Sequence, residues 1–143
     1  MSFSAKTEYG LVALIDLADA HATGELVQTG EICRRHGMPE RYLEQMLTAL
    51  RKGGYLQSIR GPRGGFRLSR SPELITIAEV EECLEGETPS ERQGDRGSPE
   101  FRALENLARQ AREGRMAVLR STTLAQLLLE RDSVRPPAPM FYI

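Results

Sequence analysis

The sequence predicts a mainly α-helical fold with a small β wing: a winged helix-turn-helix head followed by a long helix suited to dimerisation. Three observations predict it. Two helical patterns meet at a tight Gly37-Met38-Pro39 turn, two strand-like runs flank a basic, glycine-rich tip, and an amphipathic pattern of about twenty residues lies near the C-terminus. The predicted organisation is a winged helix-turn-helix DNA-binding domain over 1–86, a flexible effector-type loop over 87–97, dimerisation helices over 98–131 and a proline-rich tail over 132–143.

The first predicted helix runs from Ser4 to Ala20, with Ser4 or Thr7 as its cap. Leu26 and Val27, after a short loop, predict an extended segment that pairs with a strand. One apolar stripe of this helix recurs at three- and four-residue spacing and is predicted to be buried: Leu11, Leu14, Ile15 and Ala18.

The next predicted helix runs from Thr29 to His36, with Thr29 as its cap. It ends at Gly37, because glycine tolerates the left-handed conformation of a helix end. Pro39 suits the first turn of the helix that follows, since proline lacks a backbone N–H and its φ is already set. Two helices joined by so short a turn predict a helix-turn-helix.

The helix predicted from Glu40 to Lys52 is the candidate for reading base edges. Gln45 can present a bidentate amide to adenine, and Glu44 can accept from a cytosine amino group. Arg41 can reach a guanine or a phosphate. The helix is predicted to end at Gly53 in the left-handed conformation. Its buried stripe is predicted to be Tyr42, Leu43, Met46, Leu47 and Leu50.

A hairpin is predicted from Tyr55 to Leu68, with strands at 55–59 and 66–68. Its tip carries two cations, Arg60 and Arg63. The glycines of the tip can let the backbone approach a sugar-phosphate chain closely; they are Gly61, Gly64 and Gly65.

Charge supports nucleic-acid contact by this region. Between Arg34 and Arg70 there are nine cations and two anions, a net charge of +7, in a chain whose net charge is −1. A merely solvated face usually mixes the two signs more evenly, so this local excess indicates phosphate contact.

Three stretches of the head resemble the iron–sulfur cluster regulator (IscR) family: Tyr42-Leu43-Glu44-Gln45, residues 50–56 and residues 58–66. The resemblance covers roughly residues 3 to 85. It implies a transcription regulator that binds double-stranded DNA as a homodimer, with the start of the first helix on the DNA backbone and Arg60 in the minor groove. The residues predicted to contact DNA are Lys6, Thr7, Tyr9, Arg41, Glu44, Gln45, Ser58, Arg60, Gly61, Arg63 and Gly64. For Lys6, Thr7 and Tyr9, an ordinary core helix with a solvated end remains the alternative.

A helix is predicted from Ile77 to Leu84, capped by Thr76 and ending at Gly86. The loop that follows departs from the family. Iron–sulfur members carry three cysteine ligands there, whereas this loop has none. We therefore expect no iron–sulfur cluster and no metal site, and the effector, whether a small molecule or a protein, is not specified.

The remaining candidate ligands are scattered. They are Glu8, His21, Cys33, His36 and Cys83, and none shows convergent spacing. Cys33 is expected to be a small buried hydrophobe, and the two histidines are expected on the surface. A cluster or redox sensor with unconventional ligands is the alternative that would use them.

Ser98-Pro99-Glu100 predicts a strong helix start, and a helix of this length spans about 30 Å. Gly114 is expected to allow a kink. Ser121 or Thr122 is predicted to cap a last helix, which by resemblance packs on the other subunit, with packing inside one chain as the alternative. The predicted dimerisation residues are Phe101, Leu104, Ala108, Ala111 and Val118.

Composition excludes other classes. No apolar run is long enough to cross a membrane, the N-terminus lacks a signal peptide's apolar region, and two cysteines fit a reducing cytoplasm. No catalytic constellation has its required context, so we do not expect an enzyme. The predicted function is a homodimeric, sequence-specific transcription regulator acting as a repressor or activator. A winged-helix module that binds proteins is the alternative.

Overall fold

A computed structural model describes residues 3–86 and 97–134 of the chain. The predicted effector-type loop, apart from Gly97, and the tail beyond residue 134 lie outside the described residues. The elements are α1 (Ala5–His21), α2 (Thr29–His36), α3 (Glu40–Lys52), β1 (Leu56–Ile59), β2 (Gly65–Leu68), the 3₁₀ turn η1 (Pro72–Leu74), α4 (Ile77–Glu85), α5 (Pro99–Ser121) and α6 (Leu124–Val134). The predicted fold class, a mainly α-helical winged helix-turn-helix, is confirmed.

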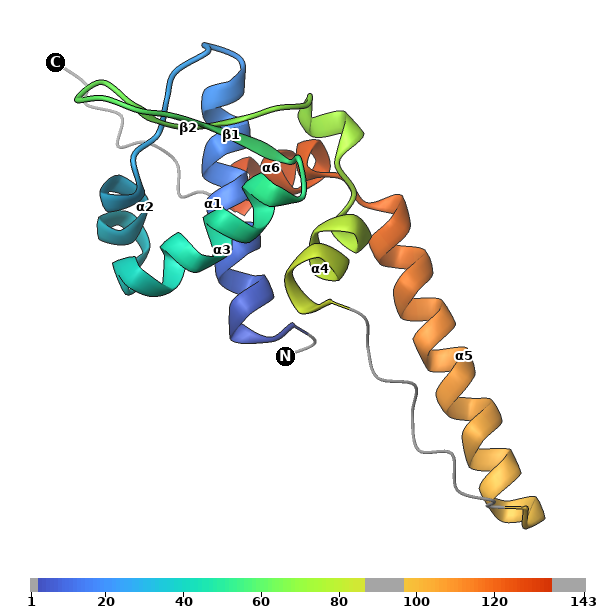
Figure 1. The fold of residues 1–143 in the computed structure, drawn as a ribbon. Coiled ribbons are helices and arrows are strands. Elements are labelled where there is room, and N and C mark those ends of the chain that lie inside the picture. Colours follow the sequence, from blue (N-terminus) through green and yellow to red (C-terminus); the bar gives the residue numbers. More distant parts are fainter. Residues whose placement is uncertain (1–2, 87–96, 135–143) are drawn as a thin grey trace, which may run out of the picture.

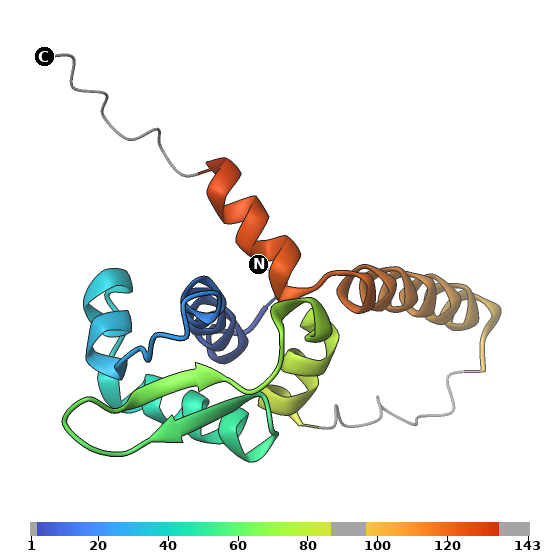
Figure 2. The ribbon, with the colours of Figure 1, turned by 90° about the horizontal axis from the view of Figure 1, so that it is seen from above.

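The head is built from α1, α2, α3 and the wing (Figure 1). The wing is the antiparallel hairpin of β1 and β2, paired from Leu56 with Leu68 at its base to Ile59 with Gly65 near its tip. Val27 adds a third segment: its N–H donates to the Phe66 carbonyl at 2.9 Å and its carbonyl accepts from the Phe66 N–H at 2.8 Å. The predicted extended segment at Leu26-Val27 is therefore confirmed. Seen from above, the hairpin lies alongside α3 and extends away from α4 (Figure 2).

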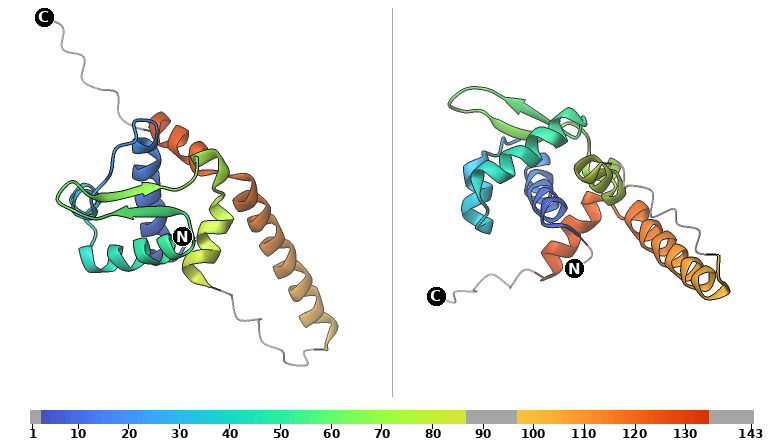
Figure 3. Two further views of the ribbon diagram at one scale, coloured as in Figure 1. Left: turned by 45° about the horizontal axis from the view of Figure 1, so that its top comes forward. Right: turned by 60° about the horizontal axis from the view of Figure 1, so that its bottom comes forward.

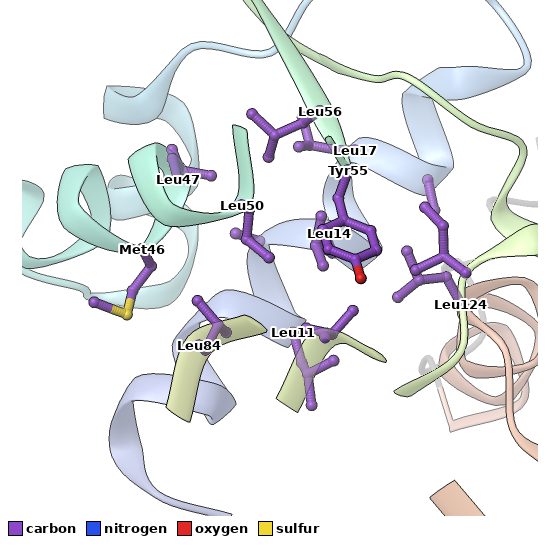
Figure 4. Close-up of a cluster of buried hydrophobic side chains, with 14 of the residues drawn as sticks. Leu11, Leu14, Leu17, Met46, Leu47, Leu50, Tyr55, Leu56, Leu84 and Leu124 are labelled. Atoms are coloured by element: carbon purple, nitrogen blue, oxygen red, sulfur yellow. The ribbon is translucent and has the colours of Figure 1, made fainter. Parts of the chain in front are cut away.

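Leucines from α1, α3, α4 and α6 meet in one core (Figure 4). Leu14 of α1 and Leu50 of α3 are completely buried there. Burying a leucine side chain stabilises a fold by about 1.5–3 kcal/mol, so this cluster holds the head together. Its labelled members are Leu11, Leu14, Leu17, Met46, Leu47, Leu50, Tyr55, Leu56, Leu84 and Leu124.

Several helix boundaries differ from the predictions in detail. Gly37 ends α2 with a left-handed φ of 67°, as predicted, but at the end of α3 the positive φ of 84° falls on Gly54, while Gly53 stays right-handed. The reason is that the α3 spiral continues through Gly53, whose N–H still donates to the Ala49 carbonyl. Pro39 precedes α3 as its N-cap instead of occupying its first turn.

The caps also differ. Gln28, not Thr29, stands at the N-cap of α2 and makes no side-chain cap bond. Before α6, Thr123 Oγ1 accepts from the Gln126 N–H and Gln126 Oε1 accepts from the Thr123 N–H. This reciprocal box replaces the predicted caps at Ser121 and Thr122, and α6 continues to Val134, into the predicted tail. Thr76 caps α4, as predicted, and it forms a full capping box with Glu79.

Beyond the head, α5 is one continuous helix through Gly114, and it projects away from the rest of the molecule (Figures 1 and 3). The chain then returns, and α6 packs against α1 and η1 of the same chain. Leu124 is completely buried, and Arg131 pairs with Asp19 of α1 at 3.0 Å. For α6, therefore, packing within one chain is what the structure shows.

Candidate nucleic-acid interface

One face of α3 is exposed and polar. Arg41, Glu44 and Gln45 all lie on the surface, while Leu43 and Leu47 on the opposite face are completely buried. The three- and four-residue spacing of the apolar side chains causes this separation, because it turns Leu43, Met46, Leu47 and Leu50 toward the core. Tyr42, predicted to be core, is only half-buried.

The wing tip presents its cations to solvent. Arg60, Gly61 and Arg63 are exposed, and so is Ser58 on β1. Gly61 has a φ of 112°, a conformation that favours glycine, so the turn depends on it.

Gly64, predicted to touch DNA, is instead buried inside the turn. A Cβ at this position would lie 2.1 Å from the Ile59 carbonyl oxygen and 2.9 Å from that of Gly61. The Gly64 carbonyl also accepts from Gln28 Nε2 at 3.4 Å. The glycine is therefore required by the closeness of the wing's own backbone, and its predicted DNA contact is corrected to a structural role.

Thr7, also predicted to contact phosphate, is completely buried. Its Oγ1 donates to Glu85 Oε1 at 2.7 Å, and the Ser4 hydroxyl donates to the same oxygen. These hydrogen bonds, with the nearby charge of Lys6, hold the pKa of the Glu85 carboxyl below its usual value. A phosphate thus has no access to Thr7, and this prediction is corrected. Glu85 was not singled out from the sequence, because nothing local to it points to a partner on α1.

Lys6 and Tyr9 are half-buried on the same helix. The Tyr9 ring meets the Tyr42 ring edge-on, with ring centroids 5.4 Å apart and an interplanar angle of 84°. Tyr9 therefore braces α1 against the start of α3, and its predicted phosphate contact stays a prediction.

Two of the nine cations of the basic stretch are committed to pairs inside the chain. Arg35 lies 3.4 Å from Asp16, and Arg70 lies 3.4 Å from Glu79 while its guanidinium stacks 4.6 Å from the centre of the Tyr55 ring. The other seven are exposed and make no ion pair within the part of the chain that the structure describes: Arg34, Arg41, Arg51, Lys52, Arg60, Arg63 and Arg67.

Asp16 is an ionisable residue that sequence reasoning missed. Its carboxylate is buried and lies 2.8 Å from Nε2 of His36, the last residue of α2. His36 lies on the surface, as expected, and its contact with Asp16 helps to fix α2 on α1. The sequence feature that could have identified Asp16 is its place between Ile15 and Leu17 in a helix predicted to be buried. A carboxylate in such a place requires a partner.

The two cysteines lie on different elements. Burial raises the pKa of the Cys83 thiol on α4, whose Sγ donates to the Ala49 carbonyl at 3.5 Å. Burial, with the nearby Glu40 and Glu44, raises the pKa of Cys33 on α2. Thiols with raised pKa values are poor nucleophiles and poor ligands. Among the described residues there is no group of three or more His, Cys, Asp or Glu side chains placed to hold a metal ion.

A helix-turn-helix with an exposed polar face, a cationic wing and a local excess of positive charge defines a DNA-binding protein of the winged helix class. Comparison with known proteins gives its family. The profile of Rrf2, an iron-dependent transcriptional regulator, matches residues 3–130, and the chain belongs to the Rrf2 family of transcription regulators.

Individual relatives of the chain are also transcription regulators. The chain is 37% identical over 144 residues to the HTH-type transcriptional regulator CymR of Bacillus subtilis, covering 100% of both proteins. It is 42% identical over 86 residues to the regulator IscR of Cereibacter sphaeroides, but this match spans 59% of the chain and only 56% of that relative.

Solved structures support the same fold. The structure of CymR, the global cysteine regulator of B. subtilis, superposes with a TM-score of 0.80 at 32% identity, over 91% of this chain and 98% of that one. IscR of T. potens gives a TM-score of 0.79 at 29% identity, over 96% of this chain and 94% of that one. The chain is thus a DNA-binding transcription regulator and not an enzyme. No described helix is long and apolar enough to cross a membrane.

Proposed function

We propose that this chain is a homodimeric, sequence-specific regulator that places α3 in the major groove and the wing in the minor groove. The observation that supports this most is the exposure of Arg41, Glu44 and Gln45 on α3 together with Arg60 and Arg63 on the neighbouring wing. A major groove admits one helix, and a minor groove attracts arginine side chains. Phosphate contacts would supply much of the affinity, which should therefore fall steeply with salt.

The dimer proposal is supported by the apolar surface of α5. Phe101, Leu104 and Val118 are 47%, 62% and 61% exposed, and Ala108 and Ala111 are exposed between them. Exposed large apolar side chains in a row along one helix are typical of a surface that another chain covers. A second copy related by two-fold symmetry would bury them and would make the operator partly palindromic.

We further propose that the regulator works without an iron–sulfur cluster. Such clusters are held by several cysteine thiolates, and this chain has only Cys33 and Cys83. The Cys83 thiol donates a hydrogen bond to the Ala49 carbonyl, and both thiols have raised pKa values. The donor set does not fit a cluster, so its effector would be of another chemical kind.

Base reading by α3 is tested by two variants on an operator obtained by selecting tight binders from random duplexes. Gln45→Ala should relax the preference at one base pair per half-site, at a cost of about 1–3 kcal/mol there, and should leave binding to random DNA unchanged. Arg60→Ala should weaken binding to operator and random DNA alike and should reduce its salt dependence.

Arg120→Ala is the matched control, because Arg120 is an exposed arginine on α5, away from the wing. Competition binding against duplexes mutated one base pair at a time makes the measurement. An equal loss on every sequence for Gln45→Ala would remove the base-reading role, and an effect of Arg120→Ala as large as that of Arg60→Ala would remove the wing contact.

A further inference from the structure

The way α5 is attached to the head carries a consequence for the operator. Residues 99–114 are exposed throughout, and only the last two turns of α5 are partly buried or buried, at Arg115, Met116 and Leu119. The views in Figures 1 and 3 show α5 leaving the head beside α4. Within the part of the chain that the structure describes, the buried side chains of α5 are confined to these last two turns, and the exposed part extends from them away from the head.

One anchor is made by backbone at the end of α5. The Ile77 N–H donates to the Thr122 carbonyl at 2.9 Å, and the Leu124 N–H donates to the Ile75 carbonyl at 2.9 Å. These bonds join the segment before α4 to the segment between α5 and α6. They lie close to Leu119, which is buried in the core, so these contacts hold α5 near its C-terminal end.

The second anchor is an ion pair between helices. Arg115 donates from one Nη to Glu81 Oε1 at 2.7 Å and from the other Nη to Oε2 at 2.5 Å, and its guanidinium lies 5.5 Å from the centre of the Phe3 ring. The two-bond geometry of a guanidinium on a carboxylate is strongly directional. Arg115 lies seven residues before Thr122, which corresponds to about 10 Å along the helix. Two attachments this far apart fix a direction.

We propose that the Arg115–Glu81 pair sets the angle of α5 to the reading head and thereby the distance between the two heads of the dimer, so that these residues determine the half-site spacing the regulator accepts. This rests on the dimer proposed above. The sixteen exposed residues span about 24 Å, and a rotation of about 10° moves their far end by about 4 Å. One base pair rises about 3.4 Å, so a small change in this angle corresponds to a whole base pair.

The test uses the full chain and the selected operator, with spacers changed by one to five base pairs between the half-sites. Each added base pair turns one half-site by about 34° relative to the other. The wild type should lose about tenfold or more in affinity for two added base pairs. Arg115→Gln and Glu81→Gln should each reduce this penalty to about threefold or less, because a freer angle between α5 and the head lets both heads reach displaced half-sites. Each variant removes one of the two charged partners of the ion pair.

Arg120→Gln is the matched control, since it makes the same change on an exposed residue of the same helix and should keep the wild-type penalty. Circular dichroism and light scattering confirm folded dimers. If both variants are folded dimers and keep the wild-type spacing penalty, the proposal is overturned. If the wild type selects no two-fold operator, or binds it as a monomer, it is the proposed function that fails. The wild type is measured before any variant, so the two failures can be told apart.

Discussion

At the scale of single residues, Glu85 determines what the first turn of α1 can do. Its carboxylate occupies the position at which Ser4 and Thr7 offer their hydroxyls. Thr7 lies 78 residues from Glu85 in sequence, so no local pattern could show that its hydroxyl is used inside the protein. The exposure of Arg41, Glu44 and Gln45, by contrast, was predictable, because helical periodicity alone turns them away from the core.

The environment of Glu85 predicts an effect of pH on stability. Hydrogen bonds from Ser4 and Thr7 lower its pKa from the usual carboxyl value of about 4.5. The stabilisation is therefore present above that value and is lost as the pH falls through the lower, folded-state pKa. Glu85→Gln should remove this contribution. The fall in melting temperature between pH 6 and about pH 3.5 should then be smaller for Glu85→Gln than for the wild type.

Glu82→Gln is the control for general charge effects, because Glu82 is an exposed acid on the same helix. Thermal unfolding followed by circular dichroism across this pH range makes the comparison. Identical pH profiles for the wild type and Glu85→Gln would show that the hydrogen bonds at α1 do not stabilise the charged carboxylate.

At the scale of elements, the hairpin of the wing could be predicted from the sequence, whereas the structural role of Gly64 within it could not. The two strands and the cationic tip follow from the sequence, because β-prone residues flank a glycine-rich turn. The burial of Gly64 does not, because it depends on how closely the backbone at Ile59 and Gly61 folds back. The sequence likewise did not decide whether α6 packs on its own chain or on the other subunit, since an apolar helix does not encode which surface it covers.

Gly64→Ala should therefore impair the wing as a unit. The added Cβ would meet the Ile59 carbonyl oxygen, a backbone atom, so the turn must rearrange and displace Arg60 and Arg63. We expect operator affinity to fall by about tenfold, while the global free energy of unfolding falls by about 0.5–3 kcal/mol and leaves the protein folded at 25 °C. Titration with labelled operator and urea unfolding measure the two effects.

Gly30→Ala is the paired control. Gly30 lies in the first turn of α2, and an added Cβ would find only Arg34 Nη1, at 3.9 Å. It should keep operator affinity and raise stability by up to about 1 kcal/mol. Wild-type affinity in folded Gly64→Ala protein would mean that the shape of the wing tip does not matter for binding.

At the scale of the whole molecule, the chain combines a head common to its family with only two cysteines, Cys33 and Cys83. The head and α5 were both predictable, because each has a clear apolar period. The loop at 87–96 lies outside the described residues, so the effector has to be sought by experiment. We propose above all that the dimer binds its operator without an iron–sulfur cluster.

The most direct test is an operator mobility-shift titration on protein purified anaerobically, with iron and sulfide measured in the same sample. We predict a colourless, iron-free dimer that shifts the operator, with an affinity that a chelator does not change. Brown protein with stoichiometric iron, whose operator binding is lost when the iron is removed, would contradict the account and would place Cys33 or Cys83 in an unconventional cluster site.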